Sequence, residues 1–138
     1  MRLKRKKLIL IFLIILIPIF LELSLYILNN GNLIVLICND SNIKNAEIEV
    51  YIDNVKVIDE FFSNEVIHYY KKFSLKVPFG NHTIVVKNRN KSITKEYRIY
   101  LFTVKWLFID FLEDTPNADN DKYIFNLESD FLPLLIKK

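Results

Sequence analysis

The sequence predicts an all-β protein: an Ig-like or transthyretin-like β-sandwich of 7–8 strands, preceded by one N-terminal transmembrane helix. The first seven residues carry five cations, and Leu8–Leu28 is then almost wholly apolar. Beyond Asn32 apolar residues recur with a period of two between polar turn signals, which is typical of short strands. Aromatic residues make up 14% of the chain and there is only one cysteine, so a hydrophobic core has to hold the domain.

The N-terminal segment has the length and charge pattern of a membrane anchor. A helix over the 21 residues from Leu8 to Leu28 extends about 30 Å, the thickness of a bilayer's hydrocarbon core. The basic cluster is expected to stay in the cytoplasm. The predicted domains are a cytoplasmic segment at 1–7, a signal-anchor helix at 8–28, a linker at 29–32 and an extracytoplasmic β-sandwich at 33–138.

Two other fates of this segment stay open as alternatives. The apolar stretch Leu8–Leu21 also has the length of a signal peptide's core, but residues 21–31 lack the small pair that signal peptidase requires. Lipid attachment at Cys38 needs a small residue before it, and Ile37 is bulky. An uncleaved anchor is therefore the leading interpretation, with Glu22 near its outer third.

The charge balance reflects topology and gives no support for nucleic-acid binding. Without the first seven residues, 14 basic side chains face 16 acidic ones, although the whole chain carries +3. Alanine occurs only twice, whereas Ile, Asn and Lys abound, which suggests an AT-rich genome and a bacterial source.

Each strand of the first half follows from its pattern. Leu33–Ile37 is a continuous apolar run, suited to a strand covered on both faces. Residues 48–52 alternate, and Asp53-Asn54 then favours a hairpin turn. On the return strand Val55, Val57 and Phe61 are expected to face inward, near a sheet edge. Residues 66–77 are expected to form one extended strand, or two with a bulge.

The second half alternates in the same way. Pro78 to Asn81 is the clearest turn, because Gly80 tolerates a positive φ. Inward-facing positions follow at 84 and 86, and again from 93 to 101, with a polar turn at 88–91 between them. Residues 104–112 read as a central strand with Val104, Trp106 and Phe108 on its buried face. A polar loop at 113–122 precedes a last strand at Tyr123–Leu127.

The middle of this domain resembles a bacterial PEGA-like or carboxypeptidase-regulatory-like β-sandwich module. The resemblance covers about 60 residues and is carried by the hairpin Glu49–Val57 and by Val77–Val86, which has the form G-x-H-x-I-x-V after a Pro/Gly turn. The PEGA signature itself is absent. Such modules are generally structural or binding appendages, so the resemblance implies a non-catalytic role.

No motif predicts an enzyme, a cofactor or a metal. His68, His82 and Cys38 are scattered, without the spacing of a zinc site or the context of a nucleophile. Cys38 reads as a small buried hydrophobe on a strand, and His82 as a turn residue that bonds loop carbonyls. The acidic loop at 114–121 lacks the glycine and distal glutamate of a calcium loop.

Tyr51, Tyr70 and Tyr100 fall on the face opposite the apolar register of their strands, and they are the candidate binding residues. The leading hypothesis is a single-pass membrane protein whose non-enzymatic sandwich has a structural or protein-interaction role in the cell envelope. The alternative is a module that binds glycan or peptide on a tyrosine-bearing face. The C-terminal run 131–138 is predicted to be a docked last strand, or else a partner-binding tail.

Overall fold

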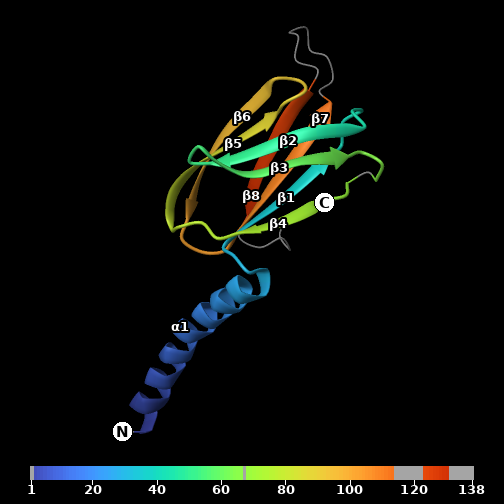
Figure 1. Ribbon diagram of the computed structural model, residues 1–138. Coiled ribbons are helices and arrows are strands. Elements are labelled where there is room, and N and C mark those ends of the chain that lie inside the picture. The colour runs from blue at the N-terminus through green and yellow to red at the C-terminus, as the bar shows by residue number, and fades with distance from the viewer. Residues whose placement is uncertain (1, 67, 114–122, 131–138) are drawn as a thin grey trace.

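The computed structural model describes residues 2–66, 68–113 and 123–130, with side chains from residue 11 onward. One helix, α1 (Arg2–Asn29), leads into eight strands that form two four-stranded sheets (Figure 1). The strands are β1 (Leu33–Asn39), β2 (Asn45–Ile52), β3 (Val55–Ser63), β4 (Lys71–Leu75), β5 (Gly80–Asn88), β6 (Ile93–Leu101), β7 (Lys105–Glu113) and β8 (Tyr123–Asp130). The expected β-sandwich preceded by one helix is therefore confirmed. The acidic loop at 114–121 and the C-terminal run at 131–138 lie outside the described residues.

The helix α1 is apolar enough to cross a membrane. Its segment Ile11–Asn29 has a mean hydropathy of 2.7, and the sandwich does not bury it. Pro18 lies inside the helix without ending it, as is common in membrane helices. At 28 residues the whole helix is about 42 Å long, which exceeds the thickness of a hydrocarbon core.

The two sheets have the strand orders β4-β1-β7-β8 and β3-β2-β5-β6. All pairings are antiparallel except that of β1 with β7, which is parallel. Immunoglobulin constant domains place strands A, B, E and D in one sheet, whereas here the first strand shares its sheet with the fourth, seventh and eighth.

The core lies between the sheets and is built from alternate residues of most strands. Both sheets contribute fully buried aliphatic and aromatic side chains, and β1 is buried on both faces, as its continuous apolar run predicts. The largest of the core side chains are Phe111, Leu33, Ile37, Ile48, Ile84, Leu101, Leu107 and Ile109.

Two expected strand phases are wrong. In β7 the core face carries Leu107, Ile109 and Phe111, each fully buried, while Trp106 and Phe108 are half-buried on the outer face. The physical reason is that β7 is apolar on both faces, so alternation does not identify the core side. Only Val104, just before the strand, is buried as expected.

In β3 a bulge reverses the predicted phase. Val50 of β2 lies opposite Ile58, but the next residue of β2 lies opposite Lys56, so Val57 is the extra residue. Ile58 and Phe62 are consequently buried, whereas Val55 and Phe61 are exposed at 65% and 66%. Of the residues expected to face inward, Val57 does pack against the core. The expected edge position of β3 is confirmed.

The strand expected over residues 66–77 is shorter than predicted, because β4 is only five residues long. His68 has a φ of 58°, which is incompatible with an extended strand. Phe73 and Leu75 nevertheless pack against the core. The turn residues Asp53 and Asn54 both have positive φ, so the predicted hairpin turn is confirmed.

The sandwich has two ends with different neighbours. We call the end beside α1 the proximal end; it contains the turn at 53–54 and the connections at 76–79 and 102–104. The distal end contains the connections at 40–44 and 89–92 and the described part of 64–70. β1 starts at the proximal end directly after α1. Strands that follow one another in the sequence run in opposite directions, so the connections lie alternately at the distal and the proximal end (Figure 1).

Candidate functional site

The connection between α1 and the sandwich is short, and the backbone N–H groups of Asn30, Gly31 and Asn32 are all hydrogen-bonded. Asn30 adopts a φ of 53°, and the N–H groups of Asn30 and Gly31 donate to the carbonyls of Ile27 and Tyr26, both at 3.2 Å. This is a Schellman motif, which ends the helix with its last carbonyls satisfied. The segment predicted as a linker is therefore a helix cap joined directly to β1.

Gly31 and Asn32 bind this cap to β4 and to the connection after it. A Cβ atom on Gly31 would lie 2.4 Å from the carbonyl oxygen of Leu75, so only glycine fits. Asn32 is 3% exposed, and its side chain donates to the carbonyl of Val77 at 2.7 Å and accepts from the N–H of Val77 at 2.9 Å. Its backbone also bonds Leu75 and Lys105. Buried polar groups in this segment are thus paired within the sandwich.

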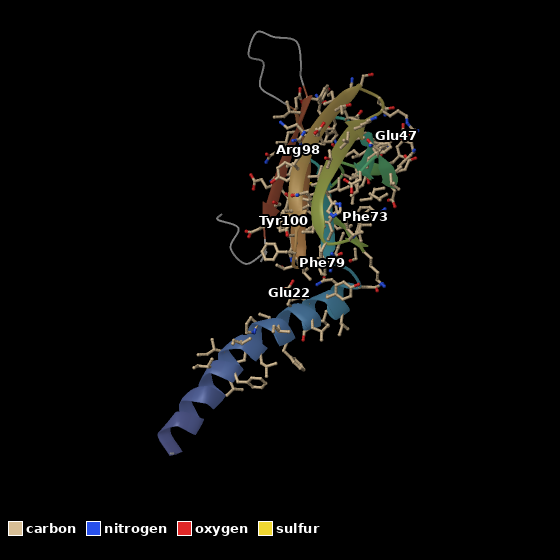
Figure 2. All side chains as sticks on the ribbon, turned by 90° about the vertical axis from the view of Figure 1, so that its left-hand side faces the viewer. Glu22, Glu47, Phe73, Phe79, Arg98 and Tyr100 are labelled. Carbon is tan, nitrogen blue, oxygen red and sulfur yellow. The ribbon has the colours of Figure 1, made fainter. Side chains whose placement is uncertain are left out.

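Two further contacts connect α1 to the sandwich above it. The carboxylate of Glu22 accepts a hydrogen bond from the backbone N–H of Val104, between β6 and β7. The ammonium group of Lys72 on β4 donates to the Asn29 side chain at 2.6 Å. The last turn of α1 contains no basic residue of its own, so Lys72 supplies the cation that favours a helix C-terminus. Figure 2 shows Glu22 on the side of α1 that faces the sandwich.

A groove opens between α1 and the proximal end. It has a volume of about 580 Å³, and its lining is mostly apolar. The lining includes Pro18, Ile19, Leu23 and Tyr26 from α1 and Phe79 and Phe102 from the sandwich. Phe79 is 70% exposed and Phe102 is 55% exposed. The ring centroid of Tyr100 lies 5.9 Å from that of Phe102, so an aromatic cluster borders the groove.

The structure brings Cys38, Asp40 and His68 together at the distal end, a juxtaposition that the sequence did not indicate. The carboxylate of Asp40 accepts from the His68 backbone at 2.9 Å, lies 2.7 Å from the His68 ring and is 3.1 Å from the thiol of Cys38. Burial, followed by the hydrogen bond to Asp40, raises the pKa of Cys38 to about 12. Cys38 is therefore a protonated thiol at neutral pH and is unsuited to nucleophilic attack.

His82 has a structural position at the proximal end. It is 8% exposed, and its ring lies 2.6 Å from the Asp53 carboxylate and 2.8 Å from the carbonyl of Pro78. The backbone N–H of Thr83, followed by the His82 ring, lowers the pKa of Asp53. The prediction that His82 bonds a loop carbonyl is confirmed. Among the residues that the structure describes, no group of three acidic, histidine or cysteine side chains is placed to hold a metal ion.

The three candidate tyrosines do not converge on one surface. Tyr51 lies on the outer face of β2 and donates to Glu49 at 2.9 Å. Tyr70 precedes β4, and its ring packs edge-on against that of Phe108, with the ring centroids 5.8 Å apart. It therefore lies beside the sheet that contains β4 and β7, whereas Tyr51 lies on the other sheet. Tyr100, on β6, is 53% exposed and lies at the proximal end (Figure 2). Tyr51 and Tyr70 are partly buried, which leaves Tyr100 as the one of the three that is mainly exposed.

An ion-pair network covers the outer face of β2, and the sequence did not predict it. Glu49 is 7% exposed and bonds Lys56 at 3.0 Å, Tyr51 at 2.9 Å and the guanidinium of Arg89. Hydrogen bonds from Lys56, Arg89 and Tyr51 lower the pKa of Glu49 to about 2. Arg89 also pairs with Glu47. The outer face of β2 is therefore polar, and its two glutamates are held by ion pairs while being largely covered by their partners.

Comparison with known proteins finds no matching protein-family model, curated protein or solved structure. The resemblance to PEGA-like modules therefore stays a prediction from the residues.

Proposed function

We propose that this chain is a single-pass membrane protein that holds a non-enzymatic β-sandwich outside the cytoplasmic membrane, with a structural or protein-interaction role in the cell envelope. Residues 1–7 stay in the cytoplasm, residues 8–28 cross the membrane, and the domain from residue 33 onward faces the other side. The basic N-terminal cluster supports this orientation.

The observation that carries the proposal is the set of contacts between α1 and the sandwich. Glu22, Asn29, Gly31 and Asn32 all contact strands or connections of the domain. Cleavage of a signal peptide among residues 21–31 would remove Glu22 from its partner Val104 and separate the helix cap from β4. A retained helix that is bonded to the domain fits a mounted, oriented module better than a secreted one.

A non-catalytic role is supported by the state of the groups best suited to chemistry. The thiol of Cys38 is protonated, and His82 is occupied by Asp53 and a backbone carbonyl. The alternative, glycan or peptide binding on a tyrosine-bearing face, rests mainly on Tyr100, the most exposed of the three tyrosines.

Topology and retention of α1 are tested together in spheroplasts. External protease should remove the domain and leave a membrane-embedded stub that carries the N-terminus. Mass spectrometry of the untreated protein should find the intact N-terminal segment. Complete protection from protease would contradict the orientation, and a mature N-terminus within residues 21–31 would contradict the anchor.

A further inference from the structure

The groove at the proximal end lies beside the part of α1 that would be inside a membrane. Ile19 and Leu23 line it together with Phe102. Ile19 precedes the helix end at Asn29 by ten residues, which corresponds to about 15 Å along the axis. If Ile11–Asn29 spans the membrane, the groove and its aromatic rim lie at the depth of acyl chains and headgroups. In that position lipid, and not bulk water, would contact the groove.

The surface of the groove has the composition that such a depth requires. Phe79, Tyr100 and Phe102 are each more than half exposed, and aromatic side chains are enriched where membrane and water meet. Ile19 and Leu23 are likewise exposed at 58% and 53%. Exposed aromatic residues of the sandwich and exposed aliphatic residues of α1 thus line the same, mostly apolar groove.

Glu22 provides a hydrogen-bond acceptor for a backbone N–H group that would otherwise be unpaired at this depth. An unpaired backbone N–H is costly in hydrocarbon, and Val104 lies between β6 and β7, where no strand partner is available in the sheet. The Glu22 carboxylate accepts the hydrogen bond of that N–H. A carboxylate in a membrane span is itself costly unless it is paired, so each group relieves the other.

We propose that the proximal end is a lipid-binding foot: Phe79, Phe102 and Tyr100 insert into the leaflet on the sandwich side, and acyl chains fill the groove against α1. The groove volume of about 580 Å³ is that of a small-molecule site. This inference rests on the proposed membrane span. It adds that the domain is held against the bilayer at a fixed end instead of standing away from it.

The test uses the full-length chain in phosphatidylcholine vesicles whose acyl chains carry bromine at defined depths. In a Trp106→Phe background, Phe102→Trp reports on the foot and Phe61→Trp is the matched control, because Phe61 is 66% exposed toward the distal end of β3. The tryptophan at 102 should lose more than half of its emission to brominated chains, whereas the one at 61 should keep its emission. Phe79→Trp replaces the first reporter if that variant does not fold.

The outcomes separate this inference from the anchor on which it rests. Extraction of the protein by alkaline carbonate would overturn both. If the protein resists extraction but shows no quenching at 102 or 79, the membrane anchor is supported and the insertion of the proximal end into lipid is refuted. Quenching at both 102 and 61 would mean that the sandwich lies flat on the membrane, which also overturns the foot. Disulfide-linked dimers of a Phe79→Cys variant, together with an unquenched tryptophan at 102, would show that a second copy fills the groove.

Discussion

Replacing Asn32 by alanine should strongly destabilise the sandwich. The Asn32 amide makes two hydrogen bonds with one residue, to the carbonyl of Val77 at 2.7 Å and from its N–H at 2.9 Å. Asn32 is 3% exposed, so water does not readily replace the lost partner. The substitution leaves a backbone donor and an acceptor unpaired, and we expect a loss of about 2–4 kcal/mol in the free energy of unfolding. That is a large share of the roughly 5–15 kcal/mol that holds a domain together.

The measurement is thermal unfolding of the full-length chain in detergent micelles, followed by near-ultraviolet circular dichroism. Each kcal/mol lowers the melting temperature of a domain of this size by about 4–8 °C, so Asn32→Ala should melt roughly 8–32 °C below the unmodified protein. Asn81→Ala is the matched control, because Asn81 is an exposed asparagine at the same end, on β5. Equal melting temperatures for the two variants would refute the account of the helix–sandwich connection.

Three further outcomes are expected. Phe111→Ala should cost about 3–5 kcal/mol, and Phe108→Ala less, because Phe111 is fully buried and Phe108 is half-buried on the other face; urea unfolding that reverses this order would contradict the phase of β7. Cys38 should react with a thiol reagent at pH 8 only after unfolding, because its pKa is raised to about 12; rapid native labelling would contradict this. The lowered pKa of Asp53 stabilises the fold above the carboxyl's ordinary value of 3.8, and that contribution should fade as the pH falls below it; acid titration of Asp53→Asn should show a shallower loss.

Much of the sandwich was predictable because most of its strands have one apolar and one polar face. The alternation in β2, β5 and β6 identifies their buried residues directly, and the Asp53-Asn54 turn follows from residue preference alone. The errors occur where this signal is absent. β7 has apolar residues on both faces. Its outer face can be apolar because other side chains cover it: Lys72 lies over the Trp106 ring, 5.4 Å from the ring centroid, and Tyr70 packs against Phe108. The size of Trp106 therefore says nothing about which face is the core.

The bulge in β3 shows a second reason why alternation in the sequence can give the wrong buried face of a strand. Alternation fixes the phase of a strand only while its pairing continues without an extra residue. The shift at Val57 exchanges the two faces for the rest of β3, so Ile58 and Phe62 enter the core and Phe61 leaves it. Whether a hairpin contains such an extra residue depends on how both strands pack, and the sequence of either strand alone does not state it.

Contacts between residues far apart in the sequence explain what was missed at the proximal end. The sequence identifies the apolar span and draws attention to Glu22 as an ionisable residue within it, because that judgement needs only local composition. Its partner, the N–H of Val104, lies 82 residues further along the chain. The fold brings the two together because α1 leads directly into β1, and because β6 ends and β7 begins at the same end of the sandwich. Glu22 is thereby the one acidic residue of the apolar stretch Leu8–Leu28 and also a contact between α1 and the sandwich, which the sequence alone does not reveal.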